Sequence, residues 1–498
     1  MEKIICLGFG ISCLGIQLLQ SQEPERSVDR GSQFSDPKPP EVFKVPQDKS
    51  IPEAKSFDRL EFHTEPKALA KGAMTEDWPR FLGPNDDATT GETKLLSAFP
   101  EGGPEVVWEM GKGTGYTSPV IVDGRLVYFH RLGDEEIIEC LEPETGKRFW
   151  SYSYPVEYRD RYGYNNGPRA SAVISEGKVY TLGVKSVLTC LDLKTGTKLW
   201  QRDLDVEFDV AEYFFGHGSC PLLYQGKVIV SLGGDDDLAV VAFDQHTGKL
   251  VWGTKHEWHA SYSSPIVKTL RGKPRLLVLM GGDTDPPTGG LLCIDPESGK
   301  LHDAFPWRAD MYTSVNAATP VLTGNDRVYI SECYVRGGIL LELDKSLKWR
   351  EVWKAPDFGM HWMTPIQSEG YLYGYRGRNE PDAWLACYEI ASGKEMWREN
   401  LEWNINLKGR TYRMQMQRGS LLKADGRYYS LGELGSLGIL ELSLKGVELK
   451  QVVQLFNARS TWSLPVVSQG LLYIVQHEPD QLSSAGRRVI CYDLRAGE

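Results

Sequence analysis

One pattern, Asp-x-x-Thr-Gly-Lys-x-x-Trp, recurs with small variations along most of this 498-residue chain. The best-preserved copies are Glu142–Trp150, Asp192–Trp200 and Asp244–Trp252. Each copy follows two alternating apolar runs, which begin after a small residue and are separated by a Gly-containing turn. Because a fixed repeat builds the fold from equal units, it constrains the architecture before any other feature.

The repeat can be counted eight times between residue 117 and the end of the chain. Each unit is typical of four short strands: two alternating runs, a third apolar segment and a Lys-x-x-Trp segment. The units run from Ser118 to Trp150, Ala172 to Trp200, Cys220 to Trp252, Ser264 to Trp307, Thr319 to Trp353, Thr364 to Trp397, Ser420 to Phe456, and Leu464 to Gly497. This spacing predicts an all-β fold, an eight-bladed β-propeller of four-stranded antiparallel blades.

The last unit ends before its fourth strand. Immediately before unit one, Glu105–Glu109 forms an apolar segment that carries Trp108 at the position of the repeat tryptophan. We therefore predict that this N-terminal strand completes the eighth blade. Such pairing closes the ring and removes the sheet edges that would otherwise be exposed.

Five cysteines occupy the same third-strand position of different units. They are Cys140, Cys190, Cys293, Cys387 and Cys491. Equivalent positions in separate blades lie beyond the Cα separation of about 7 Å that a disulfide allows. We expect these residues to be small, buried and free, and no cysteine spacing in the chain matches a zinc site.

The N-terminal 21 residues have the pattern of a secretory signal peptide. Lys3 precedes the apolar run Ile4–Leu19, and small-residue cleavage chemistry follows at Ser21. The alternatives are a transmembrane anchor, for which the run is short, and lipidation of Cys13, whose preceding residues match a lipidation signal poorly. We predict a signal peptide and a periplasmic or secreted protein.

The rest of the chain divides into two parts. Residues 22–76 are rich in Pro, Ser and charge without periodicity and predict a disordered linker. Residues 77–498 contain the propeller. The formal net charge is −11 and no Lys/Arg-rich run occurs, which excludes nucleic acid as a partner. No other segment is long and apolar enough to span a bilayer, and we expect a monomer.

The strand order predicts where a site lies. The linkers between blades and the turns between second and third strands share one face, here called the top face. Residues just before each innermost strand should point into the central funnel. The funnel candidates are Tyr116, Arg169, His217, Tyr262, Asn316, His361, Trp362, Arg418 and Trp462. Arginine forks, aromatic faces and imidazoles together suit a planar, anionic or polyhydroxylated ligand. The alternative is that these groups only bond neighbouring blades or water.

Two further top-face features have open interpretations. Acidic turns contain Asp235, Asp237, Asp283 and Asp285, whose carboxylates could hold a hard cation such as calcium or could be solvated turn residues. The linker Tyr158–Asn166 is polar and rich in tyrosine. It fits a lid, a partner contact or an ordinary packed loop.

The Asp-x-x-Thr-Gly-Lys-x-x-Trp segments resemble the tryptophan-docking repeats of the pyrroloquinoline quinone (PQQ) propeller family. Trp78–Pro84 resembles the N-terminal entry motif of that family, so the resemblance covers about residues 78–498. The chain is most similar to exported bacterial PQQ-like propellers. This family includes quinoprotein alcohol dehydrogenases and an outer-membrane assembly scaffold without quinone, so the fold does not choose a function.

The resemblance leaves two functions open. The first is a binding module that engages a small polar or anionic ligand, a protein or a polysaccharide through the funnel, without catalysis. The second is a PQQ-dependent alcohol or sugar dehydrogenase with calcium. In that case Arg169 and Arg418 would hold the quinone carboxylates, and His217 or His361 would be the catalytic base. The family's adjacent cysteine pair is missing, and its Glu, Asn and Asp calcium ligands have no clear counterparts.

Overall fold

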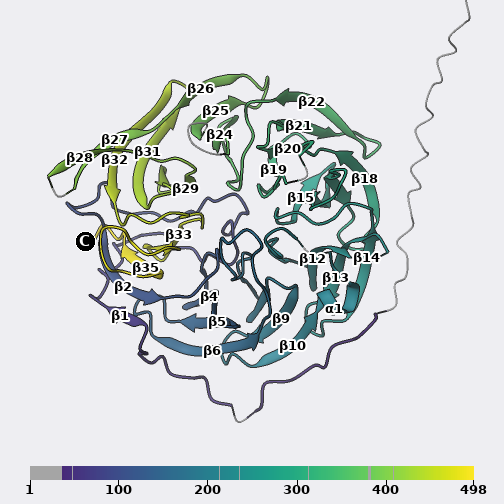
Figure 1. The fold of residues 1–498 in the computed structure, drawn as a ribbon, viewed down its shortest axis with the longest axis horizontal. Coiled ribbons are helices and arrows are strands. Elements are labelled where there is room, and N and C mark those ends of the chain that lie inside the picture. The colour runs from purple at the N-terminus through teal and green to yellow at the C-terminus, as the bar shows by residue number, and fades with distance from the viewer. Residues whose placement is uncertain are drawn as a thin grey trace, which may run out of the picture.

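Eight antiparallel blades surround a central axis in the computed structural model of this chain (Figure 1). The structure describes residues 36–47, 49–211, 213–234, 236–311, 313–378, 383–407 and 409–497. The predicted signal peptide, with Cys13, lies outside these residues. Within blades 1 to 7 the strands follow chain order from the axis outward, as the repeat predicted, and the eight-bladed all-β fold is confirmed.

The first four blades each contain one complete repeat unit. Blade 1 consists of β3 (Val120–Val122), β4 (Arg125–Leu132), β5 (Glu135–Leu141) and β6 (Arg148–Pro155). Blade 2 consists of β7 (Val173–Ser175), β8 (Lys178–Leu182), β9 (Val187–Asp192) and β10 (Lys198–Asp203), followed by the short helix α1 (Leu204–Phe208). Blade 3 consists of β11 (Leu222–Tyr224), β12 (Lys227–Gly234), β13 (Leu238–Asp244) and β14 (Leu250–Lys255). Blade 4 consists of β15 (Ile266–Leu270), β16 (Lys273–Met280), β17 (Gly290–Ile294) and β18 (Leu301–Pro306).

The next three blades follow the same order. Blade 5 consists of β19 (Val321–Gly324), β20 (Arg327–Glu332), β21 (Gly337–Leu343) and β22 (Trp349–Ala355). Blade 6 consists of β23 (Ile366–Ser368), β24 (Tyr371–Arg376), β25 (Trp384–Glu389) and β26 (Glu395–Glu399). A separate hairpin, β27 (Glu402–Leu407) and β28 (Arg410–Gln415), precedes blade 7. Blade 7 consists of β29 (Ser420–Ala424), β30 (Arg427–Leu431), β31 (Ser436–Ser443) and β32 (Gly446–Gln454).

Blade 8 joins the two ends of the propeller. Its inner strands are β33 (Val466–Ser468), β34 (Leu471–Gln476) and β35 (Arg488–Asp493), and its fourth strand is β2 (Glu105–Gly111). Trp108 of β2 pairs with Cys491 of β35, in the register that the other blades use for their repeat tryptophans. The predicted closure by the N-terminal strand is therefore confirmed. A further strand, β1 (Leu60–Phe62), covers the outer edge of β2.

Each repeat tryptophan packs on the next blade. The Trp150 indole N–H donates to the Leu193 carbonyl at 2.9 Å, and its ring lies against Gly196. Gly196 has φ +67, and a Cβ atom there would come within 2.6 Å of the indole. Five other tryptophans donate in the same way: Trp108 to Pro143, Trp200 to Gln245, Trp252 to Pro296, Trp353 to Ile390 and Trp397 to Ser443.

Two blades lack this tryptophan and use a polar contact instead. In blade 4 the register places Asp303, rather than Trp307, at the docking position. Asp303 accepts from the Lys348 ammonium at 2.9 Å and from the Trp349 backbone N–H at 2.8 Å, both in the next blade. In blade 7 the position is Gln451, whose amide exchanges two hydrogen bonds with the backbone of Phe99. The prediction that Trp307 is the docking tryptophan at the end of unit four was therefore wrong. The register places the docking position four residues earlier, at Asp303.

The described part of the predicted linker lies against the outside of the propeller. It runs past blades 3, 2, 1 and 8 as the purple coil along the lower edge of Figure 1. Asp36 forms an ion pair at 2.7 Å with Arg202, whose side chain is fully buried. The Lys55 backbone pairs with Arg148 of β6, and β1 pairs with β2. Residues 36–47 and 49–62 therefore act as an outer strap on these blades.

Residues 78–96 cross the axis on the face opposite the top face, and we call them the plug. Hydrogen bonds join the plug to five blades, at Ile121 of blade 1, Ile174 of blade 2, Lys268 of blade 4, Lys423 of blade 7 and Leu494 of blade 8. Phe81 packs against the hydrophobic cores on both sides of the ring. The segment that resembled an entry motif thus closes the bottom of the central channel.

The predicted positions of the cysteines agree with the structure. All five repeat cysteines lie on third strands, and the seven cysteines that the structure describes are buried and free. Burial raises the pKa of the Cys190 thiol to about 12, so it stays protonated at neutral pH. None of the described segments forms a helix of the length and hydropathy needed to cross a membrane.

The tryptophan contact can be tested with two glycines of blade 2 that share one backbone conformation. Gly196 has φ +67 and lies on Trp150, whereas Gly177 has φ +68, and a Cβ atom added there would meet no heavy atom within 4 Å. Gly177→Ala carries only the left-handed backbone cost of about 1–2 kcal/mol. We expect Gly196→Ala to lower the free energy of unfolding by a further ~1–3 kcal/mol, because it displaces the indole. Urea denaturation of both variants measures the difference, and equal losses would contradict the docking role.

Candidate functional site

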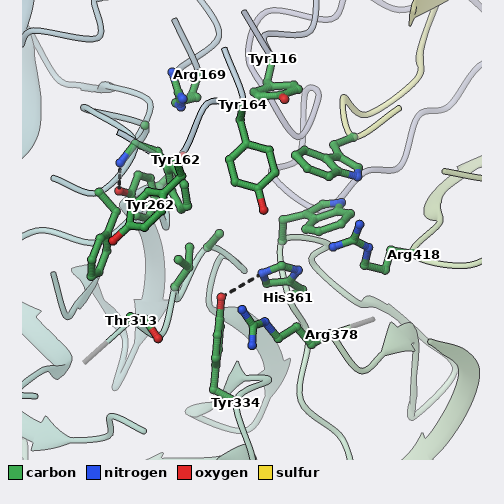
Figure 2. A pocket seen from close by; sticks show the side chains of 18 of the residues that line it. Tyr116, Tyr162, Tyr164, Arg169, Tyr262, Thr313, Tyr334, His361, Arg378 and Arg418 are labelled. Atoms are coloured by element: carbon green, nitrogen blue, oxygen red, sulfur yellow. Dashed lines mark hydrogen bonds between the residues drawn. The ribbon is translucent and has the colours of Figure 1, made fainter. Parts of the chain in front are cut away.

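A pocket of about 520 Å³ opens on the top face at the centre of the ring (Figure 2). Ten aromatic side chains, three arginines and one histidine contribute to its wall. The lining residues are Phe81, Tyr116, Tyr162, Tyr164, Arg169, Phe214, Phe215, Gly218, Cys220, Tyr262, Ser264, Thr313, Val315, Ala317, Tyr334, His361, Trp362, Arg378, Arg418 and Trp462. Phe81 belongs to the plug, so the plug closes the inner end of the pocket.

The structure brings seven of the nine predicted funnel residues to this pocket. They are Tyr116, Arg169, Tyr262, His361, Trp362, Arg418 and Trp462. Most of them lie two residues before the small residue that opens each repeat unit, such as Ser118 after Tyr116 and Ser264 after Tyr262. One position of the repeat therefore faces the axis from several blades.

His217 and Asn316 do not line the pocket. They lie one residue before this axial position, which blades 3 and 5 fill with Gly218 and Ala317. Asn316 is buried and donates to the Met280 carbonyl at 2.9 Å, while His217 packs edge-on against Tyr213. Because Gly218 and Ala317 have little or no side chain, they leave room for the pocket on that side.

Two of the arginines are already paired with carboxylates. Arg169 contacts Asp160 at 2.5 Å and also donates to the carbonyl of Gly167 at 2.6 Å. Arg418 donates from Nε to Glu433 at 2.8 Å, and a second nitrogen of its guanidinium bonds the other oxygen of Glu433. The positive charges of Arg169 and Arg418 are therefore balanced from behind the pocket wall.

Arg418 also holds two indole rings in place. Its guanidinium carbon lies 4.6 Å from the ring centre of Trp362 and 5.1 Å from that of Trp462. The ring centres of the two indoles are 5.0 Å apart, and the Trp462 N–H donates to Glu433 at 3.0 Å. Cation–π contact and hydrogen bonding together make this wall rigid.

The two histidine candidates are both held neutral. Burial, with the nearby charges of Arg418 and Arg378, lowers the pKa of His361 to about 3. Its Nε2 lies 3.1 Å from the Tyr334 hydroxyl, and its Nδ1 is buried with no hydrogen-bond partner among the described residues. Burial lowers the pKa of His217 to about 4. Neither imidazole thus presents an open nitrogen to the pocket.

The funnel positions did not include several residues that complete the pocket. Tyr162 and Tyr164, which are 47% and 51% exposed, come from the Tyr158–Asn166 linker between β6 and β7. Tyr334 and Arg378 come from the turns that follow second strands in blades 5 and 6. These turns were expected on the top face, but nothing in their sequence indicates that they fold inward.

The cation site at the acidic turns remains a prediction, because no described cluster of side chains gathers at them. Asp235 lies outside those residues, and Asp283 contacts Arg161 at 3.6 Å. Asp237 and Asp285 belong to no described group of three side chains whose ligand atoms could share one ion. The expectation of a metal at these turns gains no support from their positions.

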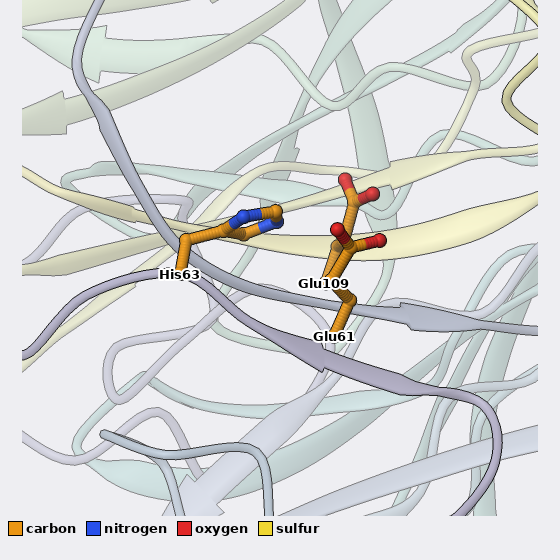
Figure 3. Close-up of side chains that lie close together, drawn as sticks. All are labelled: Glu61, His63 and Glu109. Atoms are coloured by element: carbon orange, nitrogen blue, oxygen red, sulfur yellow. The ribbon is translucent and has the colours of Figure 1, made fainter.

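One cluster of three side chains in the described part of the chain could share a metal ion. It consists of Glu61, His63 and Glu109, whose ligand atoms lie within 4.8 Å of one another. Figure 3 shows the two carboxylates next to each other, with the imidazole directed toward them. Glu109 also forms an ion pair with Arg488, which balances one of the two carboxylates. The group lies on the outer edge of blade 8, away from the pocket, and we assign no metal to it.

The described part of the chain thus forms an eight-bladed propeller whose central pocket opens on the top face and is closed toward the bottom by the plug. A family model described as outer membrane protein assembly factor BamB matches residues 134–399, which is more than half of the chain. The chain belongs to this family of PQQ-repeat propellers, and the resemblance inferred from the repeat is confirmed. No curated protein matches the sequence.

Solved structures share the fold at low sequence identity. BamB from Moraxella catarrhalis has 14% identity and a TM-score of 0.50, with 79% of this chain and 98% of that chain covered. A europium-containing methanol dehydrogenase has 10% identity and a TM-score of 0.59, with coverages of 84% and 98%. The quinohemoprotein alcohol dehydrogenase of Comamonas testosteroni has 12% identity and a TM-score of 0.55, with coverages of 85% and 81%. At these identities the likeness shows the fold alone.

The neutral state of His361 predicts a dependence of stability on pH. Its pKa in the folded protein is about 3, below the value of about 6.5 for an unfolded chain. The unfolded chain therefore takes up the proton first as the pH falls, and the contribution to stability is lost below about pH 6.5. We expect His361→Phe to lose less unfolding free energy than the wild type between about pH 7 and pH 4. Urea denaturation of both proteins across this range measures their unfolding free energies. An equal fall of the two unfolding free energies with pH would contradict the prediction.

Proposed function

We propose that this chain is an exported binding module. Its top-face pocket holds a small polar or anionic ligand, or a group on a protein or polysaccharide partner, and catalyses no reaction there. The observation that carries this proposal is the composition of the wall, in which aromatic rings and guanidinium groups surround one volume and no carboxylate occurs among the described lining residues. Such a wall supplies contact area and hydrogen-bond donors.

The environment of His361 supports binding rather than catalysis. A general base must reach the proton that it removes with a free nitrogen. The Nε2 of His361 is occupied by Tyr334 and its Nδ1 is covered, while His217 lies outside the pocket. Membership of a family described as an outer membrane protein assembly factor agrees with a role in binding a partner. The N-terminal signal-peptide pattern supports export to the periplasm or beyond.

The alternative is a PQQ-dependent alcohol or sugar dehydrogenase with calcium. When bound, PQQ would supply the redox chemistry and the protein would orient it. The aromatic walls suit a flat ring, but Arg169 and Arg418 already hold Asp160 and Glu433 in place of quinone carboxylates. The described lining also offers no carboxylate ligand for calcium. A calcium-bound quinone therefore does not fit the residues that line the pocket.

A titration with PQQ distinguishes the two functions. Trp362 and Trp462 line the pocket, so a quinone stacked there would quench tryptophan fluorescence. We expect no saturable, calcium-dependent quenching when the mature chain is titrated to high micromolar PQQ. Calcium-dependent saturation at micromolar PQQ would overturn the binding-module proposal in favour of the dehydrogenase.

A substitution that fills the pocket tests the location of the site. Ala317 lines the pocket with a single methyl group, so Ala317→Trp should occupy part of its volume. We expect this variant to lose at least about tenfold in affinity for any saccharide, peptide or small anion that alters the wild-type fluorescence. Val251→Trp adds the same side chain on the exposed outer strand β14 and serves as the control. Equal affinities of both variants would place the binding site elsewhere.

A further inference from the structure

We propose that the ligand of this pocket is a hydroxylated ring that carries one carboxylate, the chemistry of a uronic-acid sugar. This inference rests on the binding function proposed above and names the ligand class of the same site. Three features of the wall carry it: one guanidinium without an anionic partner among the described residues, a set of phenolic hydroxyls, and a rigid aromatic face.

The charge of the wall indicates a single anionic group. Of the three arginines in the lining, Arg169 is balanced by Asp160 and Arg418 by Glu433. Arg378 forms no hydrogen bond or ion pair with any residue that the structure describes. His361 adds no charge because it is neutral, as shown above. The described pocket therefore has one positive charge left over, which matches a carboxylate better than a doubly charged phosphate.

The position of Arg378 suits a carboxylate. Its guanidinium carbon lies 4.6 Å from the ring centre of Tyr334, which orients the planar group by cation–π contact. Figure 2 shows Arg378 at the same end of the pocket as Tyr334 and His361. A guanidinium stacked in this way keeps its N–H edges free, and these edges bind a carboxylate with two parallel hydrogen bonds.

The hydroxyl groups of the wall indicate that the ring is polar at its edges. Five of the lining aromatics are tyrosines, namely Tyr116, Tyr162, Tyr164, Tyr262 and Tyr334, and Ser264 and Thr313 add two further hydroxyls. In Figure 2 the Tyr164 hydroxyl is directed into the pocket, toward the end that contains His361 and Arg378. The Tyr262 hydroxyl accepts from the Phe215 N–H, and the Tyr334 hydroxyl bonds His361, so these two keep partners without a ligand. Covering the half-exposed Tyr164 side chain with an apolar ring would take its hydroxyl out of water, at a cost in free energy. Sugar hydroxyls both donate to and accept from phenols.

The aromatic wall provides a face for the ring itself. The ring centres of Tyr164 and Trp462 are 5.8 Å apart. The Trp462 ring centre lies 5.1 Å from that of Tyr116 and 5.0 Å from that of Trp362. These contacts join side chains from blade linkers on both sides of the pocket into one connected surface. The apolar C–H face of a pyranose can pack on such a surface while its hydroxyls and carboxylate reach the polar end.

The test compares an acidic disaccharide with its neutral counterpart. The mature chain is titrated with a glucuronic-acid-terminated disaccharide, with the matching glucose-terminated disaccharide, with an aromatic monocarboxylate and with PQQ, by calorimetry. We expect the acidic disaccharide to bind at least about tenfold more tightly than the neutral one. Raising the salt concentration should reduce this preference, because exposed charges are screened.

Two variants separate the contribution of the guanidinium from that of a hydroxyl. Arg378→Gln should remove the preference, so that the ratio of the two dissociation constants falls from at least about tenfold to about one. Tyr164→Phe should weaken both disaccharides, because it deletes a hydroxyl shared by both. Arg398→Gln, on the outer strand β26 of the same blade as Arg378, is the matched control and should bind as the wild type does.

Each contrary result has a distinct meaning. Equal binding of the two disaccharides, or an unchanged preference in Arg378→Gln, would overturn the carboxylate assignment. Binding of the aromatic acid without either disaccharide would overturn the sugar assignment and leave the binding function in place. Calcium-dependent binding of PQQ would overturn the sugar assignment and the proposed function together. If no disaccharide binds, this inference is wrong. The proposed function fails separately, through the comparison of Ala317→Trp with Val251→Trp described above.

Discussion

The contact between a repeat tryptophan and the glycine turn of the next blade is the interaction on which this structure depends. A propeller has no core shared by all blades, so each interface must be stabilised by itself. The Trp150 indole meets Gly196 at a distance that excludes any Cβ atom, and its N–H satisfies a carbonyl that would otherwise be buried without a partner. Repetition of this contact between blades sets their spacing and the angle between neighbours. The ring then places one axial position of several repeats around a common pocket.

Where the tryptophan is missing, other parts of the chain seal the ring. Asp303 uses an ion pair with Lys348, and Gln451 binds the backbone at Phe99, which lies hundreds of residues away in sequence. The strap, β2 and the plug all come from the N-terminal segment. Within the described residues they cover sheet edges, complete blade 8 and close the channel on the face opposite the top face.

Carboxylates behind the pocket wall balance most of its positive charge. Asp160 and Glu433 lie behind the wall and neutralise Arg169 and Arg418, which leaves these arginines as supports for tyrosine and tryptophan rings. Desolvation keeps His361 neutral and holds it against Tyr334. Two of the three arginines in this wall thus have anionic partners within the protein, and Arg378 is the exception among the described residues.

The sequence by itself determined the fold class, the blade count, the closing strand and the free cysteines, because all of these follow from a local pattern repeated at a fixed spacing. It also predicted seven of the funnel residues, since a repeat position keeps its orientation in every blade. Only the tertiary structure decided that His217 and Asn316 point away, that Tyr164, Tyr334 and Arg378 point inward, and that Asp303 replaces Trp307 at a blade interface. These outcomes depend on loops outside the repeat and on shifts of a single residue, where the direction of a side chain is set by contacts between blades rather than by neighbours in sequence.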